Sequence, residues 1–338
     1  MTNKKILILK NDRGGDLLNS IKCISSILHK NNKVTIYLSQ FNYGFAFLFK
    51  NSLVKKINYD LNWINKIYFL YLILRNNYDE VYILTPKNFY YYLAFIFRKI
   101  KFFAITVDGV KRCRPSLFLR KFLYKFVTID RKSVNIKSSS VLQLELITNY
   151  SFLDLDCKNL NTPQLENYIK DNIPKEFIFI QYKENFFNKI NLISDNFDLL
   201  LNQINKKFKY IIFFSDIEIT ASNNLFLKKY NFIDCEKKIV NFKIKDPNII
   251  YLHNINSENL FSIIEKSKKV LCPHGLLTHL CKFYKKESLN IFNFAIKNKA
   301  DVIHQKIAFS EWYKNMNIKF LFLNSDSKKT INKIIKNL

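Results

Sequence analysis

Two paired glycines precede an aspartate near the start of the chain, in the segment KNDRGGDLLNSI. Only five glycines occur in 338 residues, so we expect Gly14 and Gly15 where the backbone turns tightly or a ligand comes close. Asp16 follows them and precedes an apolar segment with helical spacing. An aspartate that faces a ligand can act as a general base and accept a proton from an attacking hydroxyl. An aspartate before a helix also commonly caps it, and both interpretations stay open.

A second glycine turn lies in CPHGLLTHL, residues 272 to 280. An apolar segment ends at Pro273, and Gly275 opens the next helical pattern. The first turn of that helix would have free amides, on Leu276, Leu277 and Thr278. Free amides at a helix start bind phosphate, so this turn predicts a phosphate site.

The sequence predicts no metal site. His274 and His279 are five residues apart, which is not the i, i+4 spacing of a helical metal pair, and no carboxylate lies near them. They are either structural or ligand-binding. The six cysteines are scattered, without a C-x-x-C pair, which favours reduced thiols in the cytosol.

Alternating strands and helices are expected to position both turns. Predicted strands lie at residues 5–9, 33–39, 80–85, 102–107, 177–182, 209–215, 248–252, 269–273 and 288–292. Predicted helices lie at 17–30, 194–207, 257–268 and 276–284. The alternation indicates an α/β protein with parallel sheets and helices on both faces, in two doubly wound halves. Such sheets bind ligands beyond the carboxyl ends of their strands, where both turns fall.

Composition and charge limit the function classes. Hydrophobic residues make up 48% of the chain and aromatic residues 16%, which excludes a disordered chain. The formal net charge is +27, which attracts anionic partners such as phosphorylated ligands, acidic lipids or nucleic acid. The longest apolar runs reach half a membrane span, so we expect a soluble or peripheral protein.

Both turns resemble one known family. ILILKNDRGGDLLNSIKCISSIL resembles the opening strand, S-x-x-G-D loop and helix of the heptosyltransferases, glycosyltransferase family 9. SKKVLCPHGLLTHLCKFYKKESLNIF resembles the family's donor motif, D-T-G-x-x-H-L-A. Weaker likenesses in VDGVKRCRPSLFLRKFLYKFV, SSSVLQLELI and FIQYKENFFNKINLISDNFDLLLNQI extend the resemblance over most of the chain.

The resemblance implies a GT-B fold, with two Rossmann-like doubly wound domains facing a cleft. Residues 1–162 would bind the acceptor and residues 163–325 the nucleotide-sugar, while 326–338 would form a C-terminal helix able to pack back on the first domain. The implied reaction is inverting transfer of a sugar without a metal.

The resemblance also implies roles for individual residues. Asp16 falls at the catalytic base, and the acceptor loop would be formed by Arg13, Gly14 and Gly15. The donor would be bound by His274, Gly275, Leu276, Leu277, Thr278 and His279, by Lys183 or Lys189, and by Glu218 at the ribose. Three positions of the donor motif depart from the family, because His274 stands at its aspartate, Gly275 at its threonine and Leu276 at its glycine.

Two stretches interleave aromatic and basic residues, NFYYYLAFIFRKIK (88–101) and RCRPSLFLRKFLYKF (112–126). They indicate either helices with an aromatic face in the core or attachment to an anionic membrane. They carry no nucleic-acid-binding motif.

The prediction is a cytoplasmic glycosyltransferase, peripheral on the inner face of the cytoplasmic membrane. It would transfer a sugar, heptose by resemblance, from a nucleotide-sugar that is ADP-linked by resemblance to a lipopolysaccharide core or related lipid-linked glycan. No cofactor and no nucleic-acid partner are expected. The alternative is a non-catalytic GT-B-like protein or a basic nucleic-acid-binding protein.

Overall fold

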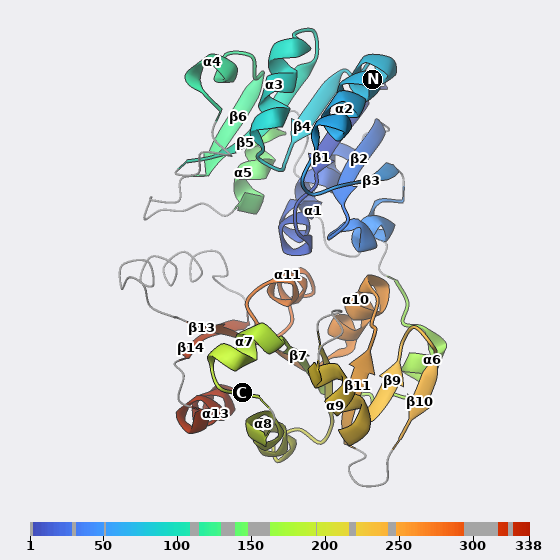
Figure 1. Cartoon of the computed structure of the whole chain (residues 1–338), viewed down its shortest axis with the longest axis vertical. Helices are drawn as coiled ribbons and strands as arrows, with labels where there is room; N and C mark the ends of the chain where they lie inside the picture. Colours follow the sequence, from blue (N-terminus) through green and yellow to red (C-terminus); the bar gives the residue numbers. More distant parts are fainter. Residues whose placement is uncertain are drawn as a thin grey trace. The chain divides into compact units, whose positions relative to one another are not determined.

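The computed structural model describes residues 3–28, 32–50, 52–108, 115–129, 139–147, 163–193, 195–215, 221–242, 248–293, 317–323 and 327–338. The chain divides into two compact units, and the change from unit 1 to unit 2 falls between residues 161 and 162 (Figure 1). Each unit contains one twisted sheet with helices packed against it.

Unit 1 has a parallel sheet in the order β3-β2-β1-β4-β5-β6. The strands are β1 (Lys5–Lys10), β2 (Lys33–Ser39), β3 (Leu53–Ile57), β4 (Glu80–Ile83), β5 (Lys101–Val107) and β6 (Lys125–Ile129). In the central strand, Leu9 lies opposite Tyr37 of β2 and Ile83 of β4. The winding direction reverses between β1 and β4, so the carboxyl ends of these two strands border the crevice in which doubly wound sheets bind ligands.

Helices cover both faces of the unit 1 sheet. They are α1 (Gly14–Leu28), the 3-10 helix η1 (Tyr43–Phe49), α2 (Trp63–Asn76), α3 (Asn88–Ile96), α4 (Leu117–Arg120) and α5 (Ser139–Leu146). Leu7 and Leu9 of β1 join a buried cluster with side chains of α2, α3 and α4. Ile6 and Ile8 are fully buried as well and point to the opposite face, where α1 contacts α5.

Unit 2 repeats this plan with a larger sheet, in the order β10-β9-β11-β8-β7-β12-β13-β14. The strands are β7 (Ile178–Tyr182), β8 (Ile211–Ser215), β9 (Asn231–Asp234), β10 (Ile239–Asn241), β11 (Ile249–His253), β12 (Lys269–Pro273), β13 (Ser288–Asn293) and β14 (Ile318–Leu323). The sheet is parallel except for β10, which pairs with β9 antiparallel, a feature that the sequence did not predict. The winding reverses between β7 and β12, which are paired neighbours.

The C-terminal helix belongs to unit 2. The helices of this unit are α6 (Asn167–Lys170), α7 (Glu184–Lys189), α8 (Asp195–Asn205), α9 (Ala221–Lys229), α10 (Ser257–Lys266), α11 (Leu276–Phe283) and α13 (Ser327–Asn337). Ile331 and Ile334 of α13 are buried in the same core as Leu200 and Leu201 of α8. The expectation that this helix packs back on the first domain is therefore wrong, because its apolar face fills the unit 2 core.

Candidate functional site

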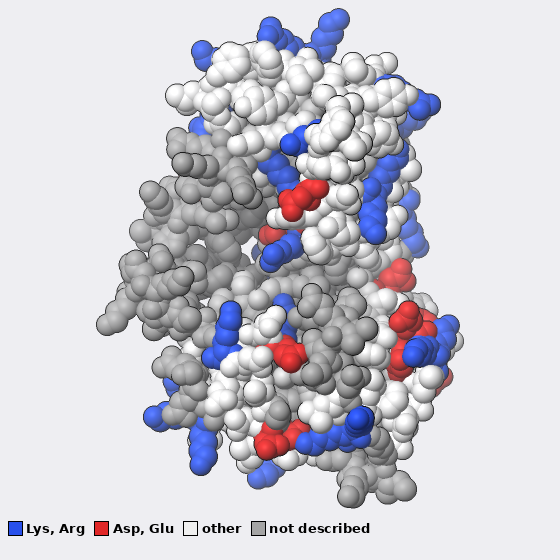
Figure 2. Space-filling view, viewed as in Figure 1, with Lys and Arg blue, Asp and Glu red and all other residues white. Residues whose placement is uncertain are grey.

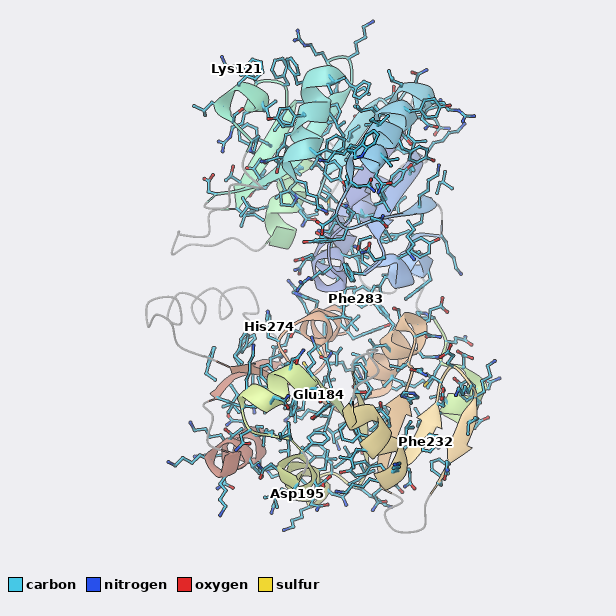
Figure 3. All side chains as sticks on the ribbon, in the orientation of Figure 1. Lys121, Glu184, Asp195, Phe232, His274 and Phe283 are labelled. Carbon is cyan, nitrogen blue, oxygen red and sulfur yellow. The ribbon has the colours of Figure 1, made fainter. Side chains whose placement is uncertain are left out.

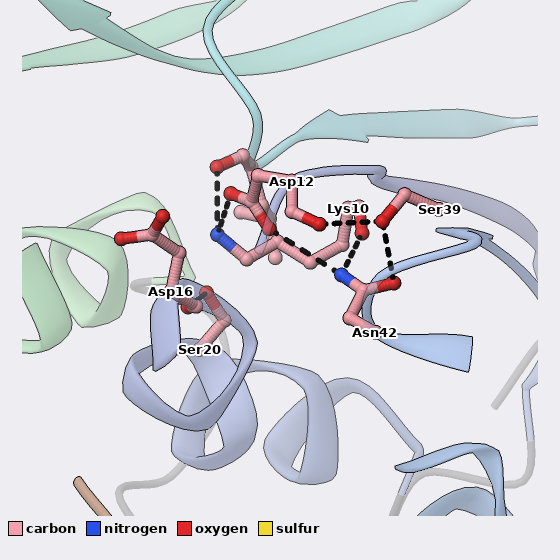
Figure 4. A network of polar contacts seen from close by, with 7 residues as sticks. Lys10, Asp12, Asp16, Ser20, Ser39 and Asn42 are labelled. Carbon is pink, nitrogen blue, oxygen red and sulfur yellow. Dashed lines mark hydrogen bonds and ion pairs between the residues drawn. The ribbon is translucent and has the colours of Figure 1, made fainter. Parts of the chain in front are cut away.

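The unit 1 turn, residues 11–16, connects β1 to α1 at the winding reversal. The helix begins at Gly14, and the Leu17 amide donates to the carbonyl of Arg13 at 3.1 Å. Asp16 therefore lies inside the first helical turn, and the interpretation of Asp16 as the N-cap is wrong. Its side chain is exposed, and its carboxylate has no hydrogen-bond partner among the described residues (Figure 4). This carboxylate is open to a ligand.

The paired glycines do not provide the backbone freedom that we expected of them. Gly14 and Gly15 are both helical, and Gly275 is the glycine with positive φ in the described part of the chain. Gly14 is buried, whereas Arg13 beside it is exposed. A small residue at the helix start also leaves room for a ligand to approach closely.

A buried ion pair supports the unit 1 turn, and the sequence analysis missed it. Lys10 Nζ lies 2.6 Å from an oxygen of Asp12, and their side chains are 3% and 13% exposed. Burial raises the pKa of Asp12, while Lys10 opposes that shift and Asp16 adds to it. The only sequence signal was two charged residues directly after a buried strand. Such a pair fixes geometry because each charge needs the other once both leave water.

Ser39 at the end of β2 and Asn42 just before η1 hydrogen-bond to the backbone of the ion pair (Figure 4). The Ser39 hydroxyl donates to the backbone carbonyl of Asp12 at 2.5 Å, and the Asn42 amide donates to the carbonyl of Lys10 at 2.8 Å. The backbone immediately before Asp16 is thus held from β1, β2 and the start of η1.

The unit 2 turn, residues 274–279, connects β12 to α11 at the second winding reversal. Gly275 has φ 159° and ψ −138°, a conformation that other residues rarely adopt. Among the described residues, no hydrogen bond is made by three amides of this turn, those of Leu276, Leu277 and Thr278. The side chain of Leu277 is buried, as that of Leu276 partly is, so these two residues can bind an anion only through their backbone. An anion at this point would also meet the positive end of the α11 dipole.

The Thr278 hydroxyl connects several groups of this turn by hydrogen bonds. It accepts from the Gly275 amide at 3.1 Å, contacts His274 Nδ1 at 3.3 Å and hydrogen-bonds to Asn290 of β13. The Cys272 thiol donates to the same Asn290 oxygen at 3.3 Å. Asn290 is fully buried, and sequence analysis did not identify it because a lone polar residue in a predicted strand gives no signal.

The structure brings one of the two candidate lysines to this turn. Lys183 directly follows β7, and its Nζ would lie 3.6 Å from a Cβ added to Gly275. Lys189 is exposed at the far end of α7. Figure 3 shows Glu184, the first residue of α7, and His274 in unit 2. The predicted ribose contact, Glu218, lies outside the described residues.

Both histidines of the unit 2 turn are neutral near pH 7. Burial, together with His279 and Lys183, lowers the pKa of His274 to about 3. Burial and Lys282 lower the pKa of His279 to about 4. The ring centroids of the two histidines lie 6.0 Å apart, and His274 stacks on Phe292 at 4.7 Å. Within the described residues, no group of three or more His, Cys, Asp or Glu side chains could hold a metal ion. The cationic group at this turn is therefore Lys183, and the histidines can act only as neutral hydrogen-bonding groups.

Solved structures share this architecture over nearly the whole chain. The structure is similar to that of Escherichia coli heptosyltransferase WaaC with ADP-2-deoxy-2-fluoro heptose, with a TM-score of 0.63 and 10% identity over 99% of this chain and 100% of that one. A glycosyltransferase family 9 structure from Veillonella parvula DSM 2008 gives 0.62 and 11% over 98% and 89%.

An enzyme of another class is similar as well. A putative UDP-N-acetylglucosamine 2-epimerase from Listeria monocytogenes gives a TM-score of 0.58 and 7% identity over 99% of this chain and 88% of that one. No protein-family model and no curated protein matches the chain. These likenesses show a GT-B fold of two Rossmann-like units, as the sequence predicted.

Proposed function

We propose that this chain is an inverting, metal-independent glycosyltransferase of the family 9 type, which uses a nucleotide-sugar as donor. The observation that carries the proposal is a pair of turns with complementary chemistry at the two winding reversals. One presents the free carboxylate of Asp16, and the other presents free amides beside the Lys183 ammonium. Because an epimerase shares the fold, the fold alone does not select transfer.

In the proposed reaction, the unit 2 turn binds the donor diphosphate. The amides of residues 276–278 and the α11 dipole accept its charge, and Lys183 provides the cation that a metal would otherwise supply. Asp16 takes the proton of an acceptor hydroxyl as its oxygen attacks the anomeric carbon from the face opposite the diphosphate. The bond to the diphosphate breaks, so the sugar is inverted and the leaving group carries away the electron pair beside Lys183.

The proposed substrates are those that the similarity to heptosyltransferase structures supports. The donor is proposed to be ADP-linked and its sugar a heptose, since the similar WaaC structure holds an ADP-heptose analogue. The acceptor is proposed to be a lipopolysaccharide core or related lipid-linked glycan, which makes the enzyme peripheral on the inner face of the cytoplasmic membrane. Within the described residues, no helix combines the length and apolar character that a membrane crossing needs.

The proposal is tested by separating binding from turnover. Thermal shift against ADP-, GDP-, UDP- and dTDP-sugars identifies the donor, because a ligand that binds the folded state raises the melting temperature. With that donor, Asp16→Asn should reduce transfer by about 10²-fold or more and leave nucleotide affinity unchanged. The matched control is Glu176→Gln, an exposed carboxylate before β7, which should keep full activity. Full turnover in Asp16→Asn would remove the general base from the proposal.

A further inference from the structure

Helix α2 of unit 1 is apolar on both of its faces. Phe69, Leu72 and Ile73 are buried against the sheet. The outward face carries six large apolar or aromatic side chains, each more than half exposed: Trp63, Ile64, Ile67, Tyr68, Tyr71 and Leu74. Their spacing places them on one side of the helix. A helix that is apolar all round is ordinarily buried, so this outward face requires a covering.

The neighbouring helices extend this face. Phe69 of α2 packs near Tyr90 of α3 at 6.0 Å between ring centroids, and Phe95 of α3 packs on Phe118 of α4 at 5.5 Å. Further side chains of α3 and α4 are more than half exposed: Tyr92, Ile96, Leu117 and Phe118. We name the exposed side chains of α2, α3 and α4 the α2–α4 surface. Figure 2 shows this part of unit 1 as mostly uncharged, with Lys and Arg at its margins.

Cations are held along the same surface. The Arg98 guanidinium lies 5.2 Å from the Phe95 ring centroid and 5.1 Å from that of Phe122, and Lys66 Nζ lies 5.7 Å from that of Phe89. The helices α2, α3 and α4 contain Lys66, Arg75 and Arg120 and no Asp or Glu. Apolar and aromatic side chains bordered by cations are the pattern of helices that lie in the head-group layer of an anionic membrane.

We propose that the α2–α4 surface is the membrane-docking face of the protein, with α2 lying in the interface of an anionic bilayer. A second copy of the chain fits this face less well, because two such surfaces would bring their cations together. With 14 residues, α2 is too short to span a bilayer, so it lies in the plane of the membrane. The inference rests on the proposed function only in its choice of partner, and it adds α2, which lies outside the basic stretches 88–101 and 112–126, to the helices α3 and α4 within them.

The test measures binding of the full-length chain to vesicles by sedimentation, without substrate. The probes are phosphatidylcholine vesicles and vesicles with about one third phosphatidylglycerol. The variant Ile64→Ser/Ile67→Ser/Leu74→Ser removes half-exposed aliphatic groups, each expected to contribute roughly fivefold to partitioning, so binding to the anionic vesicles should fall roughly 100-fold. The matched control is Ile239→Ser/Phe242→Ser in unit 2, whose side chains are 49% and 50% exposed, and it should bind like wild type.

Trp63 provides a direct readout, because its side chain is 69% exposed at the start of α2. In a Trp312→Phe background, which leaves Trp63 as the sole tryptophan, anionic vesicles should shift its emission to the blue. Wild-type protein that ignores these vesicles, or a control that loses as much binding as the α2 variant, would overturn the proposal. Concentration-dependent dimers that the α2 variant abolishes, without vesicle binding by wild type, would assign the face to a second copy. Nucleotide binding is measured separately, so a failed vesicle test leaves the proposed transfer reaction standing.

Discussion

Removal of Lys10 should destabilise unit 1 far more than removal of the whole Lys10–Asp12 pair. In Lys10→Met the Asp12 carboxylate stays buried without its counter-charge, because the two side chains are only 3% and 13% exposed and 2.6 Å apart. Breaking a buried pair of this kind costs about 3–5 kcal/mol. For a domain of 150–250 residues, each kcal/mol shifts the melting temperature by about 2–4 °C, so we expect a loss of roughly 10 °C.

The double variant Lys10→Met/Asp12→Asn is the matched control. It removes both charges and should recover most of the loss, since no uncompensated charge remains in the core. Single and double variants with equal losses would refute the argument, because the lysine would then matter only for packing.

Buried thiols allow the unfolding of the two units to be followed separately. Cys23 of α1 is fully buried, and its burial raises the thiol pKa to about 12, so it reacts with maleimide only when unit 1 opens. Short labelling pulses along a temperature ramp, read by peptide mass spectrometry, give the opening temperature. Cys281 in unit 2 is also buried and should open at the same temperature in all variants. If the temperature at which Cys23 becomes labelled falls by less than about 3 °C in Lys10→Met, the expected cost of breaking the Lys10–Asp12 pair is contradicted.

Three further predictions concern the unit 2 turn. Lys183→Ala should weaken nucleotide binding, measured by calorimetry, by at least tenfold, whereas Lys189→Ala should not; equal effects of the two variants would contradict the assignment of Lys183 to the donor site. Gly275→Val should also weaken nucleotide binding well over tenfold, because the added side chain crowds the diphosphate. EDTA should leave transfer rates unchanged, and activity that is lost in EDTA and restored by Mg²⁺ would refute a metal-free donor site. The pKa values of His274 and His279 lie below 6.5 in the folded chain, so the unfolded chain binds protons first as the pH falls. Unit 2 should therefore lose stability between about pH 6.5 and 4, by at most about 1.4 kcal/mol per pH unit for each histidine. Urea titrations of His274→Gln and His279→Gln should show a smaller change of unfolding free energy with pH, and an unchanged dependence would mean that these rings are not buried in the neutral form.

The sequence predicted the central strands and missed the edges. β1, β2, β7 and β12 are buried on both faces, so their apolar runs stand out against the polar loops. The strands that it missed, β3, β6, β9, β10 and β14, lie at or next to a sheet edge, and all but β9 are largely exposed or half-buried, with sequences such as LVKKI that tolerate charge. An edge strand is recognised mainly by its pairing partner, which a local pattern cannot reveal.

The parts of the candidate site that depend on a local sequence pattern could be predicted. A glycine at a helix start and an aspartate after paired glycines are local signals, and they identified the two turns. Lys183 could not be separated from Lys189, because the choice depends on β7 lying beside β12 in space. The Lys10–Asp12 pair and Asn290 were missed because their roles depend on burial. The local sequence around a single charged or amide residue does not show whether that residue is buried.

The two cores described above share no residue, since one is built from β1 to α4 and the other from β7 to α13. Each half of the molecule can therefore accumulate changes without disturbing the packing of the other half. If unit 1 binds the acceptor and unit 2 the donor, as proposed, recombination between β6 and β7 would exchange one preference while keeping the other. Under the proposed function, a lineage of such proteins would diversify its glycans by combining units rather than by rebuilding a site.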